Sequence, residues 1–271
     1  MPELATSNAR IAYEQSGDGP DIVWVSGGGD RGDTWRECQI PAFPGYRHTT
    51  FDNRGIGGTE CAQPIPWTIA DFAHDTAELI EAVCDPPVIV AGLSMGGFIV
   101  LQLAIDRPDL MRCGISMGTA ARADGWLYDY MKAEIDFRVA GGELVGMLGA
   151  THYLAFLYPS RALTDPVLYP KLLEGTLEWL ESGENEQSLI GQWDACCTFD
   201  CVDALPSCQV PLHVFAFGED LQAPPAYGRQ VAELAGNARL HEFDGLGHCS
   251  LYGHAEDVVN AEIQRVLEQY G

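Results

Sequence analysis

The stretch VIVAGLSMGGFIVLQLAIDRP (residues 88–108) carries the clearest structural signal in the chain. Its first five residues form an apolar run that predicts a strand buried on both faces of a sheet. The residues from 96 onwards predict a long apolar helix that ends at Asp-Arg-Pro. Between them, G-L-S-M-G at 92–96 places Ser94 on a tight strand-to-helix turn. The glycines two positions to either side fit such a turn, because larger side chains would collide there.

A second serine, Ser116, stands in the same G-x-S-x-G pattern at residues 114–118. The pattern alone cannot choose between the two serines, since short motifs recur by chance in a chain with 30 glycines. Their contexts differ, because the TAARADG that follows Ser116 does not predict a helix like the one after Ser94. We therefore interpret Ser94 as a nucleophile and Ser116 as a residue inside or at the end of a strand.

Strands and helices alternate on both sides of this stretch, which predicts an α/β fold with a mostly parallel central sheet flanked by helices. Thr68 is a suitable N-cap for the first of these helices. The predicted strands are 10–15, 22–26, 48–55, 88–92, 113–118, 212–218 and 238–243. The predicted helices are 69–83, 96–108, 225–235 and 254–269.

The alternation stops between residues 121 and 200, where the pattern is helical and lacks clear strands. Eleven of the 26 aromatic residues fall in this segment. We interpret 121–200 as a helical cap over the carboxyl ends of the strands, and 1–120 with 201–271 as the core. Part of the aromatic enrichment must attach the cap to the core, and the remainder is expected to line an apolar pocket over Ser94.

A nucleophilic serine needs a histidine base, and His248 is the best candidate among the seven histidines. It lies in FDGLGHCS, just after a predicted strand, where two preceding glycines allow a sharp loop. His213 and His241 fall inside predicted strands. His254 falls at the start of the last predicted helix, where the helix dipole disfavours an imidazolium.

The base needs an orienting carboxylate, which at such a turn stands between the serine and the histidine along the chain. Asp220 follows the predicted strand LHVFAFG and precedes Ala-Pro-Pro in this interval. The adjacent Glu219 is the alternative. Ser94, Asp220 and His248 are thus the predicted catalytic residues, each at a strand end.

Stabilising an oxyanion requires two backbone N–H donors. One is expected from Met95, the residue after the nucleophile. The other is expected from the glycine-rich loop after strand 22–26, with Gly28 favoured and Gly27 or Gly29 left open.

The GGG loop, FDNRGIGGT, GLSMGG, FGEDLQAPP and GLGH together resemble the α/β-hydrolase superfamily along nearly the whole chain. The resemblance is strongest to its capped members: carboxylesterases, enol-lactonases, carbon–carbon bond hydrolases and cofactor-free haloperoxidases. It implies the same roles for Ser94, Asp220 and His248. Ser26 departs from the pattern, because many relatives carry a histidine before the glycine.

The expected function is that of a serine hydrolase that acts on a medium-sized hydrophobic ester, lactone or thioester through an acyl-enzyme. The alternatives are the same triad used for carbon–carbon cleavage, perhydrolysis or cyclisation, and a non-catalytic ligand-binding protein. A dinucleotide-dependent oxidoreductase is disfavoured, although residues 27–32 match G-x-G-x-x-G and Asp52 stands where a ribose-binding acid would. Asp30 would bring negative charge to the pyrophosphate, and Pro41 and Pro44 interrupt the helix that the motif requires.

The charge balance bears on which partners the protein can bind. The 39 acidic and 15 basic residues give a net charge of −24, which disfavours nucleic acid and anionic membranes, and only Lys132 and Lys171 are lysines. Nine cysteines without a CxxC pair favour buried thiols over a metal site, so no metal or organic cofactor is expected. Without a signal pattern or an apolar run of about 18 residues, the sequence predicts a cytoplasmic protein whose partner is a small-molecule substrate, and it leaves the oligomeric state open.

Overall fold

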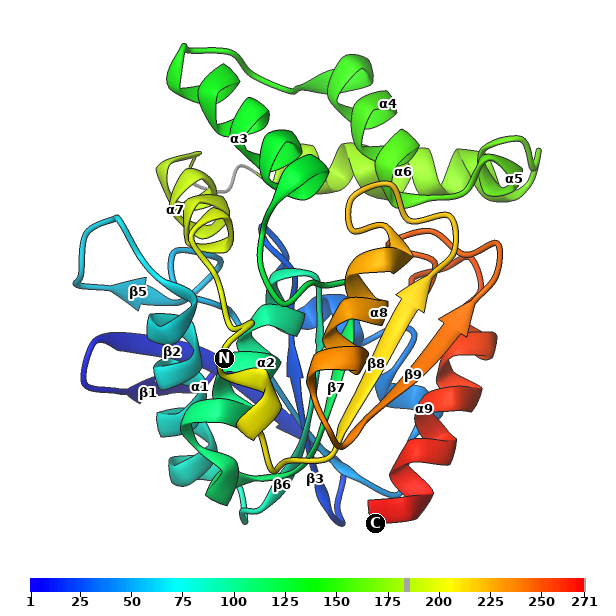
Figure 1. The fold of residues 1–271 in the computed structure, drawn as a ribbon. Helices are drawn as coiled ribbons and strands as arrows, with labels where there is room; N and C mark the ends of the chain where they lie inside the picture. Colours follow the sequence, from blue (N-terminus) through cyan, green and yellow to red (C-terminus); the bar gives the residue numbers. More distant parts are fainter. Residues whose placement is uncertain (183–185, 271) are drawn as a thin grey trace.

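The computed structural model of the protein describes residues 1–182 and 186–270. In this part of the chain, a nine-stranded sheet has the strand order β1-β2-β4-β3-β6-β7-β8-β9, with β5 paired to β2 (Figure 1). Neighbouring strands in the series β4-β3-β6-β7-β8-β9 pair in parallel. Strand β2 pairs antiparallel with β1, β4 and β5. The strands are β1 Glu3–Ala5, β2 Ala9–Ser16, β3 Asp21–Val25, β4 Arg47–Phe51, β5 Glu60–Cys61, β6 Val88–Leu93, β7 Met111–Met117, β8 Leu212–Phe217 and β9 Ala238–Phe243.

Four helices cover the two faces of the sheet: α1 Ile69–Val83, α2 Met95–Asp106, α8 Pro225–Leu234 and α9 Glu256–Tyr270. Successive strand residues point to opposite faces, so a strand buried on both faces must be apolar throughout. In β3, Val23 packs in the core cluster that contains residues of α1, α2 and α8, whereas Trp24 packs in the cluster that contains residues of α9. The continuous apolar strands that the sequence predicted are therefore explained by two cores.

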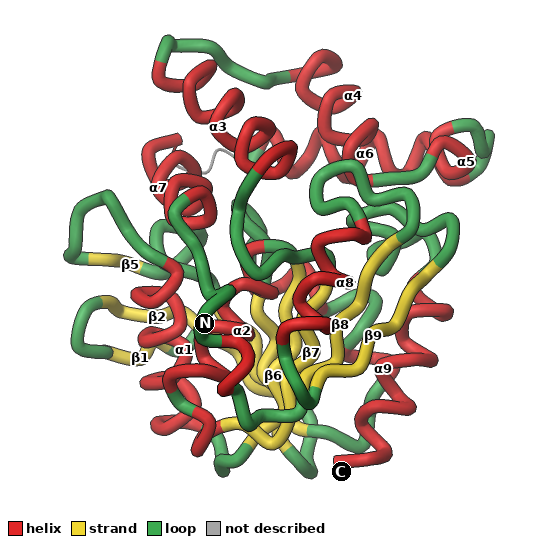
Figure 2. The backbone as a smooth tube through the Cα atoms, viewed as in Figure 1, coloured by secondary structure: helices red, strands yellow, loops and turns green. Residues whose placement is uncertain are grey.

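Five further helices lie between β7 and β8 in the chain and over the carboxyl ends of the strands (Figures 1 and 2). We refer to them as the cap helices. None of the helices in residues 1–182 and 186–270 is long and apolar enough to cross a membrane. The cap helices are α3 Gly125–Val139, α4 Gly146–Leu157, α5 Ser160–Leu163, α6 Leu168–Glu181 and α7 Glu186–Cys197.

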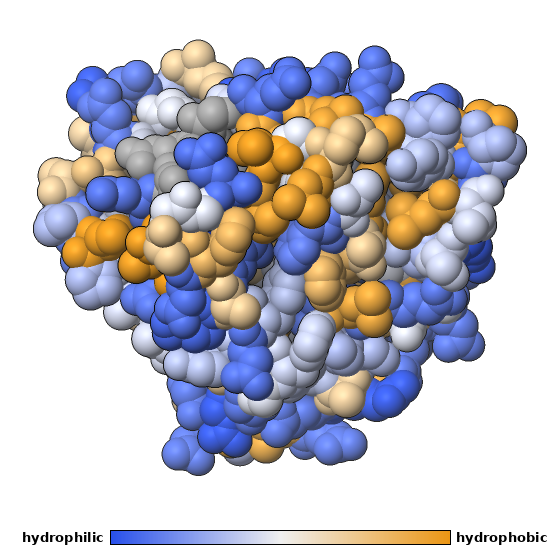
Figure 3. All heavy atoms as spheres, turned by 90° about the horizontal axis from the view of Figure 1, so that it is seen from above, coloured by the Kyte–Doolittle hydropathy of each residue, from blue (hydrophilic) through white to orange (hydrophobic). Residues whose placement is uncertain are grey.

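The outer surface of the cap helices is partly apolar, as the view from above shows (Figure 3). Phe137 is 44% exposed and Leu148 is 70% exposed. Part of the apolar character of this segment is therefore exposed and does not serve the interior.

Several local predictions can be compared with the structure directly. Thr68 caps α1 and forms a capping box with Asp71, as its position predicted. The stretch 48–55, predicted as a strand that ends in a polar loop, contains β4 up to Phe51 and then a loop, and the last helix begins at Glu256 rather than 254. β1 and β5 were not predicted, because strands of three and two residues are too short to show an alternating pattern.

Candidate active site

Ser94 lies between the end of β6 and the start of α2, in a backbone conformation with φ 57° and ψ −118°. It is the one non-glycine residue with positive φ in the described part of the chain. The turn demands its glycines, because a Cβ at Gly92 would lie 2.3 Å from the Gly96 oxygen and one at Gly96 would lie 2.1 Å from the Val25 oxygen. The two glycines therefore allow a strained backbone at Ser94, which places this serine at the carboxyl edge of the sheet.

His248 and Asp220 come from the loops after β9 and β8 and are hydrogen-bonded to each other. His248 Nδ1 lies 2.6 Å from Asp220 Oδ2, and each residue is only 2% exposed. The other carboxylate oxygen, Oδ1, accepts hydrogen bonds from the backbone N–H groups of Gln222 and Ala223, both at 2.8 Å. These donors fix the carboxylate, and the carboxylate in turn orients the imidazole with its Nδ1–H donating.

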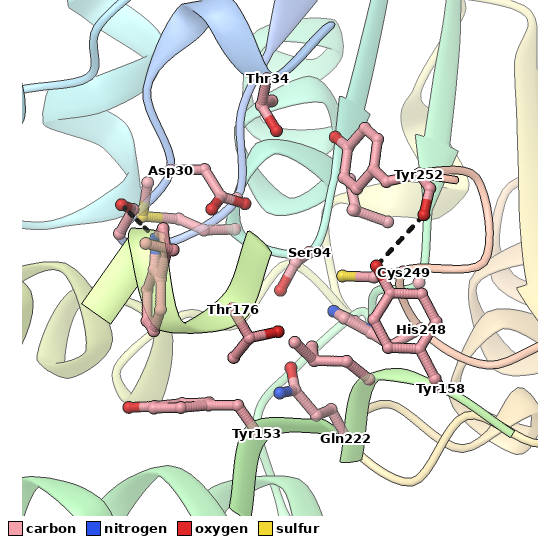
Figure 4. A pocket seen from close by; sticks show the side chains of 18 of the residues that line it. Asp30, Thr34, Ser94, Tyr153, Tyr158, Thr176, Gln222, His248, Cys249 and Tyr252 are labelled. Carbon is pink, nitrogen blue, oxygen red and sulfur yellow. Dashed lines mark hydrogen bonds between the residues drawn. The ribbon is translucent and has the colours of Figure 1, made fainter. Parts of the chain in front are cut away.

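The second ring nitrogen of His248, Nε2, is buried and has no hydrogen-bond partner among the described residues. It faces the cavity that Ser94 also lines, and Figure 4 shows the two side chains pointing toward one another. Gly118 makes room for this pair, since a Cβ there would lie 3.1 Å from His248 Nδ1. The structure therefore brings together the three residues that the sequence predicted as catalytic.

The competing residues lie elsewhere. Ser116 is buried inside β7, where its hydroxyl donates to the Gly97 oxygen at 3.2 Å. The Glu219 side chain is exposed, whereas Asp220 is buried against the imidazole. His254 lies before α9 and not within it, and burial lowers the pKa of its imidazole, followed by the nearby Arg161 charge. The last helix therefore begins two residues after His254, and not at His254 as the sequence predicted.

The other two histidines considered as the base, His213 and His241, are hydrogen-bonded away from Ser94. His213 Nδ1 and His241 Nε2 lie 3.0 Å apart, and His241 Nδ1 lies 2.8 Å from Glu262 Oε1. Both rings are buried at the far strands of the sheet, as the strand pattern indicated.

The expected oxyanion donors lie on the two sides of Ser94. Met95 opens α2, so its N–H has no partner within the helix. In the glycine-rich loop, Gly29 N–H already donates to Gln192 Oε1 at 2.8 Å, which removes it as an oxyanion donor. Gly28 remains the favoured second donor, and a Cβ there would lie 3.0 Å from Nε1 of Trp193.

The loop that carries Gly28 is held from above by the cap helices. Gln192 of α7 is fully buried, and its amide also donates to the Arg54 oxygen at 3.0 Å. Trp179 Nε1 of α6 donates to the Gly29 oxygen at 3.2 Å. Below, Arg54 forms a buried bidentate ion pair with Asp75, at 2.7 and 2.8 Å. Sequence reasoning missed these contacts, because no local pattern links residue 29 to residue 192.

Two features that the sequence left open have structural explanations. The carboxylate of Asp52 accepts backbone hydrogen bonds from Gly32 and Gly58, both at 2.9 Å, so it shapes the loops and is not available to a ribose. Ser26, which replaces the usual histidine, donates to the Arg31 oxygen and accepts from Nε1 of Trp35, both at 3.0 Å. The hydroxyl thereby fixes the shape of the glycine-rich loop.

A cavity of about 1040 Å³ lies between the strand ends and the cap helices and contains Ser94 and His248. Five of the eleven aromatic residues between 121 and 200 line it, while Trp126 and Phe137 are about half exposed on the outside. Lys171 and Glu178 of α6 also line the cavity, so its walls are not purely apolar. The five lining aromatic residues are Tyr130, Tyr153, Tyr158, Trp179 and Trp193.

Asp30 is a further acid in this cavity that sequence reasoning did not assign to the site. Burial raises the pKa of its carboxyl from 3.8 to about 6, the positive charge of His248 opposes that rise, and Asp33 adds to it. Within residues 1–182 and 186–270, no cluster of histidine, cysteine or acidic residues is arranged to hold a metal ion, and the cysteines are free thiols.

Comparisons with known proteins identify the family of the chain. The model of the alpha/beta hydrolase family matches residues 22–262. The chain is 32% identical to "Putative non-heme bromoperoxidase BpoC" of Mycobacterium tuberculosis over 94% of this chain and 97% of that protein. It is 27% identical to "Putative carbamate hydrolase RutD" of Azorhizobium caulinodans over 92% of this chain and 91% of that protein.

Solved structures extend the likeness. The crystal structure of BpoC from Mycobacterium tuberculosis H37Rv superposes with a TM-score of 0.89 at 30% identity, covering 96% of each chain. The enol-lactonase of Burkholderia xenovorans LB400 shares the fold with a TM-score of 0.82 at 23% identity, covering 98% of this chain and all of that one. The chain belongs to the α/β-hydrolase family and is an α/β-hydrolase enzyme.

Proposed function

We propose that this enzyme is a serine hydrolase in which Ser94 attacks the carbonyl carbon of a medium-sized hydrophobic ester, lactone or thioester. The observation that carries the proposal is the unpartnered, buried Nε2 of His248, which faces Ser94 while Nδ1 is bound to Asp220. An imidazole whose Nδ1–H donates to a carboxylate has a free lone pair on Nε2, which can accept a proton from a hydroxyl in the cavity.

The reaction then follows from the positions of these groups. His248 Nε2 takes the proton of the Ser94 hydroxyl as its oxygen bonds to the carbonyl carbon, and Asp220 stabilises the imidazolium. The N–H groups of Met95 and Gly28 bind the oxyanion. The imidazolium gives its proton to the departing alcohol or thiol, which leaves an acyl group on Ser94. Water, deprotonated by His248, releases the acid by the reverse sequence of steps.

The cavity supports a substrate of moderate size with an apolar body. Its volume of about 1040 Å³ is at the upper end of small-molecule sites, and five aromatic side chains between residues 121 and 200 are among the residues that line it. The hydrolase names of relatives such as RutD favour hydrolytic chemistry, although their own substrates differ from one another.

The nucleophile is tested by labelling the enzyme with a fluorophosphonate and mapping the modified residue by mass spectrometry. We expect the adduct on Ser94, with labelling retained in Ser116→Ala and lost in Ser94→Ala. An adduct on Ser116, or an active preparation that resists the reagent, would refute the assignment.

The substrate class is tested with a panel of acyl esters of graded size, run beside lactones, thioesters and β-diketones. We expect kcat/KM to rise with apolar or aromatic groups on the acyl or alcohol side. A preference for acetyl esters without any gain from apolar groups contradicts the pocket argument. If only β-diketones are turned over, the enzyme is a carbon–carbon bond hydrolase and not an ester hydrolase.

A further inference from the structure

The Asp30 carboxyl lines the active-site cavity close to the nucleophile. Asp30 Oδ2 and Ser94 Cβ lie against the same glycine, since a Cβ on Gly27 would be 3.2 Å from the first and 3.5 Å from the second. Among the described residues, no side chain or backbone group forms a hydrogen bond or ion pair with the Asp30 carboxyl. Figure 4 shows this carboxyl on the same side of the cavity as Thr34 and Tyr252.

An ionised carboxylate in such a place is costly. Taking a charge out of water without a partner is unfavourable, which is why burial raises the pKa of Asp30 to about 6. A pKa near 6 still leaves Asp30 mostly ionised at neutral pH. At neutral pH the enzyme therefore carries a half-buried negative charge beside Ser94 that the nearby His248 offsets only in part, and a cation in the cavity would stabilise it further.

Two tyrosines, Tyr158 and Tyr252, line the same cavity as this carboxyl. The Tyr158 hydroxyl donates to the backbone oxygen of Tyr252 at 3.1 Å, and the Tyr252 hydroxyl is buried without a partner among the described residues. Burial raises the pKa of both phenols well above 10, and the charge of Asp30 contributes to the rise in each. Both rings are therefore neutral, and neutral aromatic faces attract cations.

The surrounding charges favour a cation as well. The charged residues that line the cavity include the acids Asp33, Glu37 and Glu256, and its basic residues are Arg31, Arg36 and Lys171. Arg36 is paired with Glu14. The thiol of Cys249, which also lies near Asp30, is neutral because burial raises its pKa well above 9.

We propose that Asp30, Tyr158 and Tyr252 form a subsite for an alkylammonium group beside Ser94. The inference rests on the proposed hydrolase function and narrows it: the preferred substrates are esters that combine an apolar body with a cationic arm. Asp30 supplies the charge, and the two rings supply polarisable walls that need no hydrogen bonds from the cation.

The effect of the positive charge on the substrate can be measured with two esters that have the same shape and differ only in that charge. Choline butyrate and 3,3-dimethylbutyl butyrate differ in a quaternary nitrogen against a quaternary carbon, so the nitrogen stays charged at every pH. Both use the same triad, so the ratio of their kcat/KM values cancels changes that affect the shared reacting groups. The Asp30→Asn profile serves as the reference for any pH dependence that does not come from Asp30.

In the wild type, we expect the ratio to favour the choline ester at pH 8 and to fall as the pH drops through about 6. In Asp30→Asn, we expect the ratio at pH 8 to fall about tenfold, the effect of one partly desolvated charge at several ångströms. Most of its pH dependence should be lost. Asp18→Asn, which removes one acid from the exposed turn after β2, is the control for net charge and should leave the ratio unchanged.

Equilibrium binding separates this inference from the proposed function. Calorimetry on Ser94→Ala, which cannot turn over an ester, should show tighter binding of choline than of 3,3-dimethylbutan-1-ol at pH 8. Adding Asp30→Asn should abolish that preference. Selective binding without hydrolysis by the wild type would refute the hydrolase and keep the subsite. An Asp30→Asn enzyme with the wild-type ratio, or Ser94→Ala with no preference for choline, would overturn the subsite.

Discussion

The two walls of the active-site cavity are built in different ways. The wall formed by the strand ends holds Ser94, Asp220 and His248 by short loops, whose conformations depend on nearby glycines and backbone hydrogen bonds. The wall formed by the cap helices acts through single side chains, such as Gln192 and Trp179, that reach across from more than 140 residues away in sequence. In the proposed mechanism, the first wall places the reacting groups, and the second adjusts the loop that would receive the oxyanion and shapes the space for the substrate. Variants of each wall should therefore fail in different ways.

The largest effect is expected where the strand-end wall loses a reacting group. His248→Ala and Asp220→Asn should each lower kcat by about 10⁴-fold or more, because the base is lost or its tautomer is wrong. Glu219→Gln is the matched control and should retain nearly full activity, since its side chain is exposed. Steady-state kinetics on a chromogenic ester measures all three. A large loss of kcat in Glu219→Gln together with a small loss in Asp220→Asn would identify Glu219, and not Asp220, as the partner of His248.

A smaller effect is expected where the cap wall releases the oxyanion loop. Gln192→Leu keeps the volume but removes the hydrogen bonds to Gly29 and Arg54, so Gly28 N–H should lose its alignment. We expect kcat to fall by about 10- to 100-fold with little change in KM, somewhat less than the loss of an oxyanion donor itself. The affinity for a trifluoromethyl ketone, which forms a tetrahedral adduct on the serine, should fall in parallel.

The control for this variant is Gln209→Leu, which changes the same residue type on the exposed surface. A Gln192→Leu enzyme with raised KM and unchanged kcat would mean that Gln192 contacts the substrate and does not position the loop. Equal losses in both glutamine variants would reduce the effect to general stability.

The smallest effect concerns stability and depends on pH. The pKa of Asp30 is raised in the fold, so its favourable contribution is complete below about pH 4 and is lost as the pH rises through about 6. Asp30→Asn removes the penalty of the ionised form. It should stabilise the protein by about 1–3 kcal/mol at pH 8 and by nothing at pH 4.

Thermal unfolding at the two pH values checks this expectation, with Asp18→Asn as the control. A stabilised Asp30→Asn that has lost its choline preference would show that Asp30 is kept for binding at a cost in stability. Equal unfolding temperatures of Asp30→Asn and the wild type at pH 8 would show that the carboxylate carries no such penalty.

The strand-end wall was largely predictable because its determinants are local. The glycines around Ser94 exclude side chains at 2.1 to 2.3 Å, and this steric demand leaves the G-x-S-x-G pattern in the sequence. Asp220 and His248 follow β8 and β9, which pair in parallel, so the loops that carry them meet at the same edge of the sheet. The α/β fold itself was predicted correctly, since long alternating elements determine it.

The cap wall was not predictable in the same way. Its helices were visible in the pattern, but nothing near Gln192 indicates that its amide binds Gly29 and Arg54. The aromatic content predicted a lining for the pocket without separating Trp179, which lines it, from Phe137, which is 44% exposed. The sequence showed Asp30 only as a charge in the glycine-rich loop, because its place in the cavity depends on residues far along the chain that line the same space.

The scarcity of lysine has a practical consequence for watching this enzyme at work. Lys132 lies on α3, where it pairs with Asp136, and Lys171 lies on α6 and lines the cavity. Because these are the two lysines of the chain, an amine-reactive dye attaches only to cap helices and to the amino terminus. A single-lysine variant, Lys132→Arg, confines the side-chain label to the cavity wall. Its fluorescence would then report the arrival of a substrate optically, without any reporter built into the substrate.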